Sequence, residues 1–332
     1  MQNFRHHQQA GLALLSFVFV LSACGIADAS VIEGSFERTL TVAGALDLDI
    51  RTDSGHIKVI AGPPGEVRIN GRIRASSGFR VSESEAEDKV RRLESNPPVE
   101  QSGNTVRIGH IDDPELERRV SISYDVVVPT DTRVSSHSDS GGQDIQGIRG
   151  PVTAQADSGG LTIAGITESV EAQTDSGGQR ISNVGGSVES KADSGGLHIA
   201  SVRGAVTART DSGGIHASEV TGAFEAQADS GAISADGAGG AVSIRTDSGS
   251  VKVTQSTPGP IEIQTDSGGV RLKIASGASH DVDISTDSGG INLNQPMDGL
   301  TSSRRNKQLS GKLRGGGQPL TIRTDSGSIT VD

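Results

Sequence analysis

The tripeptide Asp-Ser-Gly occurs eleven times in this 332-residue chain, and its carboxylates are the groups best suited to chemistry. Seven of the aspartates follow one another at constant steps of 18 residues: Asp139, Asp157, Asp175, Asp193, Asp211, Asp229 and Asp247. In a column with neighbours about 4.8 Å apart, adjacent carboxylates would repel each other by roughly 0.9 kcal/mol in water. Hydrogen bonds from the amides of each turn, or bound Ca²⁺, must offset that repulsion. We expect a turn-capping ladder, with a weak calcium site as the alternative, because the nine-residue glycine-rich repeat of calcium-binding β-rolls is absent.

Other combinations of reactive side chains are weaker. A catalytic serine is needed once, whereas Asp-Ser-Gly is repeated and lacks the strand–elbow–helix context of a hydrolase nucleophile. His198 and His216 share the position five residues after an aspartate, but no third metal ligand accompanies them, so we interpret them as part of a solvated face. No phosphate-binding or dinucleotide fingerprint occurs. The sequence therefore predicts no catalytic residues, no transition-metal site and no cofactor apart from the calcium alternative.

The residues around each aspartate alternate between apolar and polar side chains. Five positions before it stand residues such as Val152, Val170 and Val188, and four and six positions after it stand aliphatic residues such as Leu197 and Ile199. A period of two is typical of half-buried strands. Each unit is therefore predicted to be a strand, an Asp-Ser-Gly turn, a second strand and a second turn.

The constant period predicts how these units pack. A short unit cannot bury its apolar face alone and must stack on its neighbours. Identical residues lie over one another if each coil pairs with the next in a parallel sheet. We therefore predict an all-β fold, a parallel β-solenoid (β-helix) of about 18-residue coils. The composition fits a narrow stack with many corners, because there are 45 glycines and only 2% aromatic residues.

The N-terminus predicts the compartment. An apolar run at residues 11–20 is too short to be interpreted first as a membrane span, and it ends in Leu21-Ser-Ala-Cys24-Gly25. That string resembles the lipobox of bacterial lipoproteins, which implies cleavage before Cys24 and attachment of lipid to its sulfur. The alternative is an ordinary cleaved signal with an incidental cysteine. Lipid on Cys24 would hold the protein on a membrane, the outer membrane if the cell is Gram-negative.

The remaining chain divides by pattern. We expect a lipoprotein signal peptide at 1–23, a tether at 24–37, and N-terminal coils at 38–132 with one short helix at 82–95 that caps the stack. Solenoid repeats should fill 133–332, with a basic loop at 297–316. The step of 38 residues from Asp287 to Asp325 is interpreted as two turns of 19. The formal net charge of −11 disfavours binding of nucleic acid.

Three features together resemble one protein family. They are the opening coil at Leu48–Val59, the strand Tyr124-Asp-Val-Val-Val-Pro129 and the serial Asp-Ser-Gly-Gly turns. Over residues 40–332 the chain is similar to the putative-adhesin β-strand-repeat family of bacterial cell-envelope proteins. The resemblance implies a β-helical fold and assigns no catalytic residue.

Three functions follow as hypotheses. The first is a non-enzymatic, lipid-anchored envelope protein, an adhesin-like or scaffold rod that binds a protein or polysaccharide partner. The second is a cation-binding repeat protein. The third, a β-helix carbohydrate-active enzyme, is disfavoured because such enzymes gather carboxylates, basic residues and aromatic platforms in one groove, and this chain has almost no aromatic residues to offer.

Overall fold

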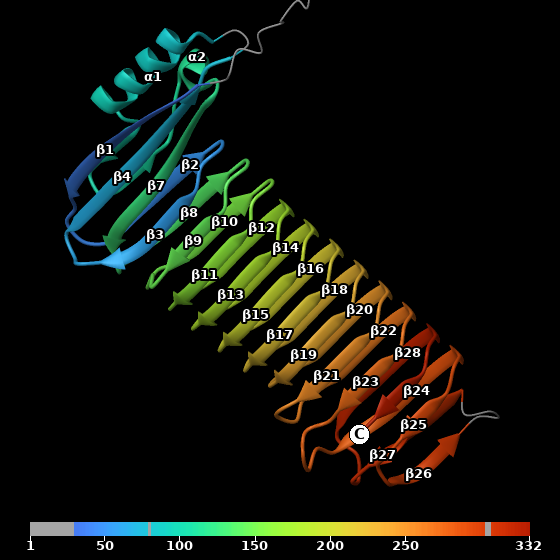
Figure 1. The fold of residues 1–332 in the computed structure, drawn as a ribbon. Helices are drawn as coiled ribbons and strands as arrows, with labels where there is room; N and C mark the ends of the chain where they lie inside the picture. Colours follow the sequence, from blue (N-terminus) through green and yellow to red (C-terminus); the bar gives the residue numbers. More distant parts are fainter. Residues whose placement is uncertain (1–29, 79–80, 303–306) are drawn as a thin grey trace, which may run out of the picture.

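The chain folds into a rod of stacked coils, in which two long sheets face each other along the whole length (Figure 1). The computed structural model describes residues 30–78, 81–302 and 307–332. Sheet A has 14 strands, in the spatial order β1 (Val31–Thr41), β4 (Glu66–Ser76), β7 (Val120–Pro129), β3 (Ile57–Gly62), β9 (Gln143–Gln146), β11 (Leu161–Ile166), β13 (Gln179–Val184), β15 (Leu197–Val202), β17 (Ile215–Val220), β19 (Ile233–Ala238), β21 (Val251–Gln255), β23 (Val270–Lys273), β29 (Ile329–Val331) and β25 (Ile291–Leu293).

Sheet B runs opposite sheet A and has 15 strands. Their spatial order is β26 (Met297–Ser302), β27 (Gln308–Leu313), β24 (His280–Ser288), β28 (Gln318–Ser326), β22 (Ile261–Ser267), β20 (Val242–Ser248), β18 (Phe224–Ser230), β16 (Val206–Ser212), β14 (Val188–Ser194), β12 (Val170–Ser176), β10 (Val152–Ala156), β8 (Thr132–Ser138), β2 (Leu46–Thr52), β6 (Thr105–Ile108) and β5 (Val99–Ser102). Each coil of the rod contributes one strand to each sheet.

The predicted parallel stacking is confirmed. Val170 pairs with Val152 on one side and with Val188 on the other, so residues 18 positions apart lie over one another. All three side chains are buried in the narrow core between the sheets. On sheet A, Ile199 is buried in the same core and pairs with Ile181 in the preceding coil. The period of two in the sequence therefore places the aliphatic side chains inside and the polar side chains on the two outer faces.

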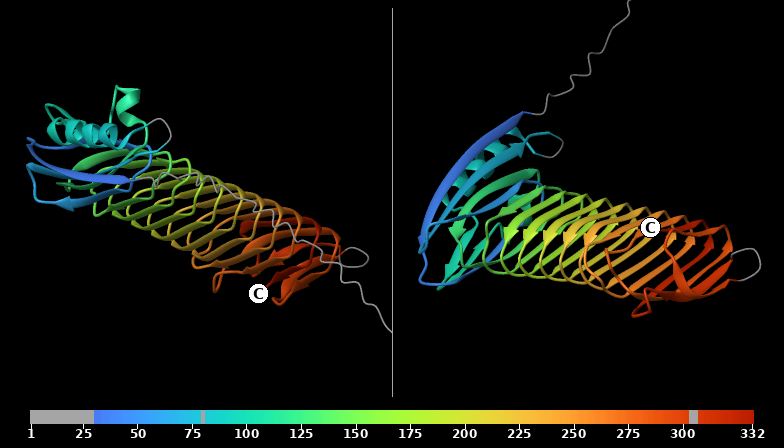
Figure 2. Two further views of the ribbon diagram at one scale, coloured as in Figure 1. Left: turned by 45° about the horizontal axis from the view of Figure 1, so that its top comes forward. Right: turned by 90° about the horizontal axis from the view of Figure 1, so that it is seen from below.

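The N-terminal end is closed by antiparallel strands and a helix, as both views in Figure 2 show. β1 pairs antiparallel with β4, and β4 pairs antiparallel with β7. These strands extend sheet A beyond the first coil, at the N-terminal end of the rod. The tether expected at 24–37 is therefore wrong for residues 31–37, which belong to β1. Phe36 explains why this segment is ordered, because it is buried in the core, where its ring makes an edge-to-face contact with Tyr124.

Helix α1 (Glu83–Ser95) covers the face of β1 and β4 and corresponds to the helix expected at 82–95. Ser82 accepts a hydrogen bond from the Glu85 amide, while the Glu85 carboxylate accepts one from the Ser82 amide. This capping box fixes the first turn of the helix. Ala86, Val90 and Leu93 are the buried residues of α1. A second helix, α2 (Pro114–Glu117), is a single turn that begins after Asp113.

At the C-terminal end, the coils do not stack in the order in which they occur in the sequence. β28 lies between β22 and β24 in Figure 1, so the coil of Asp325 stacks directly on the coil of Asp266. The two-turn interpretation of the 38-residue step is therefore wrong. Leu320 and Ile329 of the inserted coil are fully buried, whereas Ile291 in the end coil is only partly buried. One edge of β24 is occupied by β27, so the last coil pairs with the other edge of β24 and becomes enclosed.

The basic loop expected at 297–316 is also wrong, because this segment contains two strands. β27 pairs antiparallel with β24 and with β26. Leu309 and Leu313 are buried and attach the segment to the end of the core. The alternation of these two leucines with polar residues is weak, because Gly311 stands between them. The positively charged residues of this segment that the structure describes lie on or beside these strands.

Candidate functional site

The aspartates of the repeat lie in one column at the first corner of the coils, and their carboxylates are exposed. The hydrogen bonds that close this corner join backbones. The Ser158 amide donates to the Asp139 carbonyl and the Ser176 amide to the Asp157 carbonyl, each at 2.7 Å. Among the described residues, the hydrogen bonds at these turns include none from a turn amide to a carboxylate of the column. The expected capping by the side chains is therefore replaced by a ladder of backbone bonds.

Buried hydroxyls support the same corner from inside. Thr174 is fully buried and donates a hydrogen bond of 2.9 Å to the Gly177 carbonyl. Ser138 has the same position in its coil and donates to the Gly141 carbonyl at 2.7 Å. These side chains satisfy carbonyls that would otherwise face an apolar core. The residues before the aspartates are therefore structural.

Two glutamines occupy core positions that hold leucine or isoleucine elsewhere. The Gln179 side-chain amide donates to the Thr174 hydroxyl at 3.1 Å and to the Lys191 carbonyl at 2.5 Å. Its carbonyl oxygen accepts a hydrogen bond of 2.8 Å from the Ser190 hydroxyl. The Gln143 side-chain amide likewise donates to the Ser138 hydroxyl, while its carbonyl oxygen accepts a hydrogen bond from Ser136 of the same coil. Both networks are fully paired, so they hold the coils in register and leave no free polar group for a ligand.

The two glycines of each turn have different surroundings. A Cβ atom on the first glycine would meet the backbone of the preceding coil, as for Gly195, where it would lie 2.2 Å from the Gly177 carbonyl oxygen. A Cβ atom on the second glycine would have room, as for Gly196, where the nearest atoms are 3.8 Å away. The first glycine is therefore required for stacking, whereas the second leaves an empty place on the outer face of sheet A.

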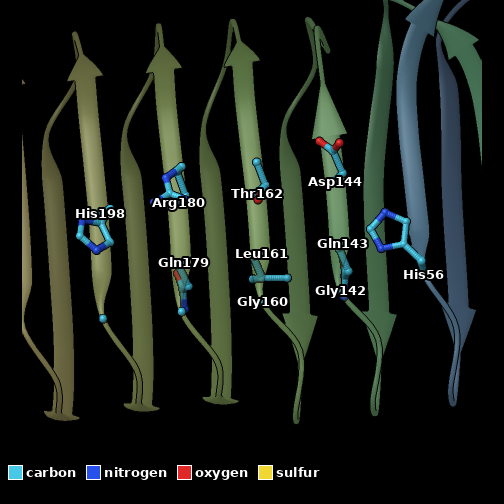
Figure 3. Close-up of a pocket in the computed structure, with 12 residues that line it drawn as sticks. His56, Gly142, Gln143, Asp144, Gly160, Leu161, Thr162, Gln179, Arg180 and His198 are labelled. Atoms are coloured by element: carbon cyan, nitrogen blue, oxygen red, sulfur yellow. The ribbon is translucent and has the colours of Figure 1, made fainter.

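The second glycines line up to form the floor of a groove, shown in Figure 3. Successive strands of sheet A present Asp144, Thr162, Arg180 and His198 along one side, and His56 stands at one end. The groove has a volume of about 580 Å³. Five consecutive coils have glycine at the floor position: Gly142, Gly160, Gly178, Gly196 and Gly214. The groove therefore lies over a row of positions without side chains, and its lining extends from His56 to His198.

The groove is lined by polar groups with few partners. The Gln146 side-chain amide donates a hydrogen bond of 2.7 Å to Asp144. Within the part of the chain that the structure describes, no ion pair or hydrogen bond engages the side chains of Thr162, Arg180 or His198. The rings of His198 and His216 lie with their centroids 6.0 Å apart on adjacent strands, as expected from their shared position. Such a surface can exchange its water for a polar ligand without losing internal contacts.

A second groove follows the other corner of the coils. It has a volume of about 490 Å³ and is lined by polar residues that include Asn183, Ser201 and Glu219. These three residues have φ angles of 56°, 56° and 53°, in the left-handed region that other coils fill with glycine. The Ser201 hydroxyl donates a hydrogen bond of 2.7 Å to the Glu219 carboxylate. Because these side chains already bind each other, this groove is less suited to a ligand.

One acidic contact joins the first aspartate of the series to the N-terminal end. Glu117 of α2 lies against Asp53, and partial burial together with the nearby carboxylates of Asp53 and Asp139 raises the pKa of Glu117. Burial and the charge of Asp53 also raise the pKa of Tyr124. Over residues 30–78, 81–302 and 307–332, no group of three His, Cys, Asp or Glu side chains is placed to hold a metal ion. We interpret this contact as a structural one that attaches α2 to the first coil.

Comparison with known proteins identifies the family. The family model described as Toastrack DUF4097 matches residues 45–332, which is most of the chain. The chain belongs to the Toastrack DUF4097 family. The predicted adhesin-like β-repeat family and β-solenoid fold are thereby confirmed. No curated protein matches the sequence.

Two solved structures are also similar to this Toastrack chain. One is a "putative adhesin" from Bacteroides fragilis, with 12% identity and a TM-score of 0.32, covering 90% of this chain and 97% of the other. The other is a "putative cell adhesion protein" from Clostridium sporogenes, with 9% identity and a TM-score of 0.17, covering 90% and 99%. Superpositions with scores this low carry no argument about the function of this chain.

Sequence reasoning placed the aspartate column and the histidine pair correctly but missed the groove. The signal was present, because the first glycine of the turn is kept in coils where the second is replaced, as Gly231-Ala232 and Gly249-Ser250 show. Cys24 lies outside the described residues. Of the helices in the described part of the chain, none is long and apolar enough to cross a membrane.

Proposed function

We propose that this protein is a non-enzymatic, lipid-anchored rod of the bacterial cell envelope that binds a surface polymer along the groove of sheet A. The observation that carries the proposal is the glycine floor from Gly142 to Gly196. It gives an open, polar channel that crosses consecutive coils and suits an extended ligand rather than a compact one. The lipobox-like sequence before Cys24 supports attachment to the outer membrane of a Gram-negative cell or to the membrane of another bacterium.

The side chains around the groove support binding rather than catalysis. An acyl-transfer site needs a nucleophile, a base and an orienting group within hydrogen-bond distance of one another. Among the described residues, the imidazole–carboxylate contacts are His137 with Asp139 and His110 with Asp49, and neither histidine is bonded to a serine hydroxyl. A pair of facing carboxylates, as in glycosidases, does not line the groove, where Asp144 is the only acidic residue.

Lipid attachment has a direct test. Cells that express the full chain would be labelled with a palmitate analogue, and a Cys24→Ser variant would serve as the control. The proposal expects label on the wild-type protein and none on the variant, with the variant released from the membrane fraction. Release of both proteins from the membrane fraction, with label on neither, would contradict the lipid anchor and favour an ordinary cleaved signal.

Groove binding has a separate test with matched variants. Gly178→Gln and Gly196→Gln place side chains in the groove, because both positions have room for a Cβ atom. Ser243→Gln makes the same kind of change on the exposed outer face of sheet B. On an array of cell-surface glycans, with and without calcium, we expect binding by wild type and by Ser243→Gln, and strongly reduced binding by the two groove variants. Unchanged binding by all three variants would refute the groove as the site.

A further inference from the structure

Charged side chains on the two outer faces of the rod differ in whether they form ion pairs. On sheet B, acidic and basic side chains are paired with each other. Lys191 lies 2.6 Å from Glu189, Arg209 lies 3.3 Å from Glu225, and the same pattern recurs at both ends of the sheet. Opposite charges on neighbouring positions therefore neutralise most of this face. It offers little attraction for a charged ligand.

Sheet A also has ion pairs on its N-terminal strands, such as Arg72 with Asp125, but from β13 to β23 its outer face carries cations without such partners. Arg180, Lys252 and Arg271 occupy one row, five residues after the aspartates, and His198 and His216 stand between them. All five side chains are exposed. In the described part of the chain, no ion pair engages the three permanently charged residues. Lys273 is a further exposed cation on the last of these strands. The acidic residues on the strands of this stretch are Asp236 and, beside the second corner, Glu219, which accepts a hydrogen bond from Ser201.

This row is long and narrow, as a binding site for an extended polymer would be. Its members come from successive strands β13, β15, β17, β19, β21 and β23, which are neighbours in sheet A. With strands about 4.8 Å apart, the row from Arg180 to Arg271 extends over roughly 24 Å. It begins inside the groove, which Arg180 and His198 line, and continues along the rod. The formal net charge of the whole chain is −11, so a basic face is a local departure from its surroundings.

We propose that the polymer bound along sheet A is an anionic polysaccharide, whose acidic groups pair with the row of Arg180, Lys252 and Arg271. This rests on the proposed function and specifies the ligand of the same groove. Exposed cations that lack a partner in the protein lose little when an anion binds, because no internal ion pair has to break first. The cations and the two histidines stand in one row across consecutive strands, which fits an extended chain that carries several acidic groups.

The same face argues against the other polyanions. Proteins that bind single-stranded nucleic acid add aromatic side chains on which bases stack. The described aromatic residues Phe36, Tyr124 and Phe224 are all buried. Binding to an anionic membrane surface uses apolar side chains that enter the lipid. Val31, far from the row, is the one large apolar residue strongly exposed among those that the structure describes.

The test compares two neutralised faces of the full chain, purified in detergent. In the sheet A variant, Arg180→Thr, Lys252→Ser and Arg271→Thr introduce residues that the same column already contains elsewhere, such as Thr162 and Ser234. The sheet B variant carries Lys191→Gln, Arg209→Gln and Arg245→Gln. These substitutions likewise introduce a residue type that the same column contains in other coils, such as Gln173 and Gln227. Both variants lose three positive charges, so net charge is matched. Circular dichroism checks that both are folded.

The probes are polygalacturonate and its fully methyl-esterified form, which has the same sugar chain without charge. We expect the sheet A variant to bind polygalacturonate at least about tenfold more weakly than wild type, because three exposed charge contacts are lost. The sheet B variant should stay within about twofold of wild type. Raising the salt concentration should weaken wild-type binding more than binding by the sheet A variant.

The outcomes separate this inference from the function on which it rests. Equal affinity of wild type for the charged and esterified polymers would overturn the anionic specificity and leave polymer binding intact. Equal losses in the two variants would overturn the assignment to sheet A. Tighter binding of the wild type to an oligonucleotide, or of the lipid-free Cys24→Ser variant to phosphatidylglycerol vesicles, than to polygalacturonate would overturn the glycan class. A wild-type protein that binds neither polysaccharide nor any glycan of the array would refute the proposed function itself.

Discussion

The adjacent glycines Gly195 and Gly196 allow the stacking of the coils to be tested by one methyl group. Alanine at 195 would place its Cβ atom 2.2 Å from the Gly177 carbonyl oxygen, although ordinary contacts of a Cβ atom begin at 3.4 Å. The two coils would have to separate by about 1 Å. Alanine at 196 would meet nothing closer than 3.8 Å. The same substitution is therefore expected to have very different effects at neighbouring positions.

The magnitude follows from what the separation breaks. The Gly177 amide bonds to the Ser194 carbonyl at 3.2 Å, and the Gln179 amide bonds to the Gly196 carbonyl at 3.0 Å, both across this interface. Losing two hydrogen bonds costs about 1 kcal/mol each, and overpacking costs about 1–3 kcal/mol more. We expect Gly195→Ala to lower the free energy of unfolding by about 2–4 kcal/mol. Gly196→Ala should change it by no more than about 0.5 kcal/mol.

The assay is urea unfolding of the full-length variants, followed by far-ultraviolet circular dichroism. Because each coil contacts only its neighbours, a local clash also lowers the cooperativity of the transition. Equal stabilities of the two variants would refute the reasoning, since it would mean that residues 18 apart are not pressed together at this corner. A larger loss for Gly196→Ala would refute it as well.

Three further predictions concern the buried polar groups and the aspartate column. Gln179→Leu should destabilise the protein by about 1–3 kcal/mol in the same unfolding assay because it leaves the Ser190 hydroxyl unpaired; adding Ser190→Ala should recover much of the loss, and no recovery would contradict the network. His280 is buried, its Nδ1 bonds to the Gln318 carbonyl and its Nε2 has no partner, so burial lowers its pKa below the usual 6.5. The unfolded chain then binds the proton more readily, so stability should fall as the pH drops below about 6.5, and His280→Leu should lose this dependence in a series of melting temperatures. Asp193→Asn should leave the melting temperature unchanged or raise it slightly, because it removes repulsion between exposed carboxylates, and a chelator should leave the wild-type value unchanged; a clear drop in either experiment would mean that the column caps its turns or holds cations.

The regular part of the fold was predictable because one physical pattern repeats. Alternation of apolar and polar residues fixed which side chains point inward, and the 18-residue step fixed which residues stack. The two ends were less predictable. The insertion of the Asp325 coil beside Asp266 depends on β27 occupying one edge of β24, which a local pattern does not express. The pairing of β1 with β4 depends on contacts between distant segments for the same reason.

The site was only partly predictable. The sequence shows that Arg180 and Lys252 share a column, but it does not show that sheet B pairs its charges while the stretch of sheet A from β13 to β23 leaves its cations unpaired. That difference depends on the reach and rotamers of side chains such as Lys191 and Glu189. The prediction that the carboxylates cap their turns was wrong for a related reason. The backbone amides of each turn donate to carbonyls of the adjacent coil instead of to the aspartate side chains.

The most direct test of a polymer on sheet A is chemical footprinting of histidines with diethyl pyrocarbonate, read by mass spectrometry. His198 and His216 lie within the basic row, whereas His137 is half-buried on the opposite sheet. Bound polygalacturonate should slow modification of His198 and His216 and leave His137 unchanged, and the esterified polymer should protect none of the three. Protection of His137 instead, or of all three to the same degree, would contradict binding along sheet A.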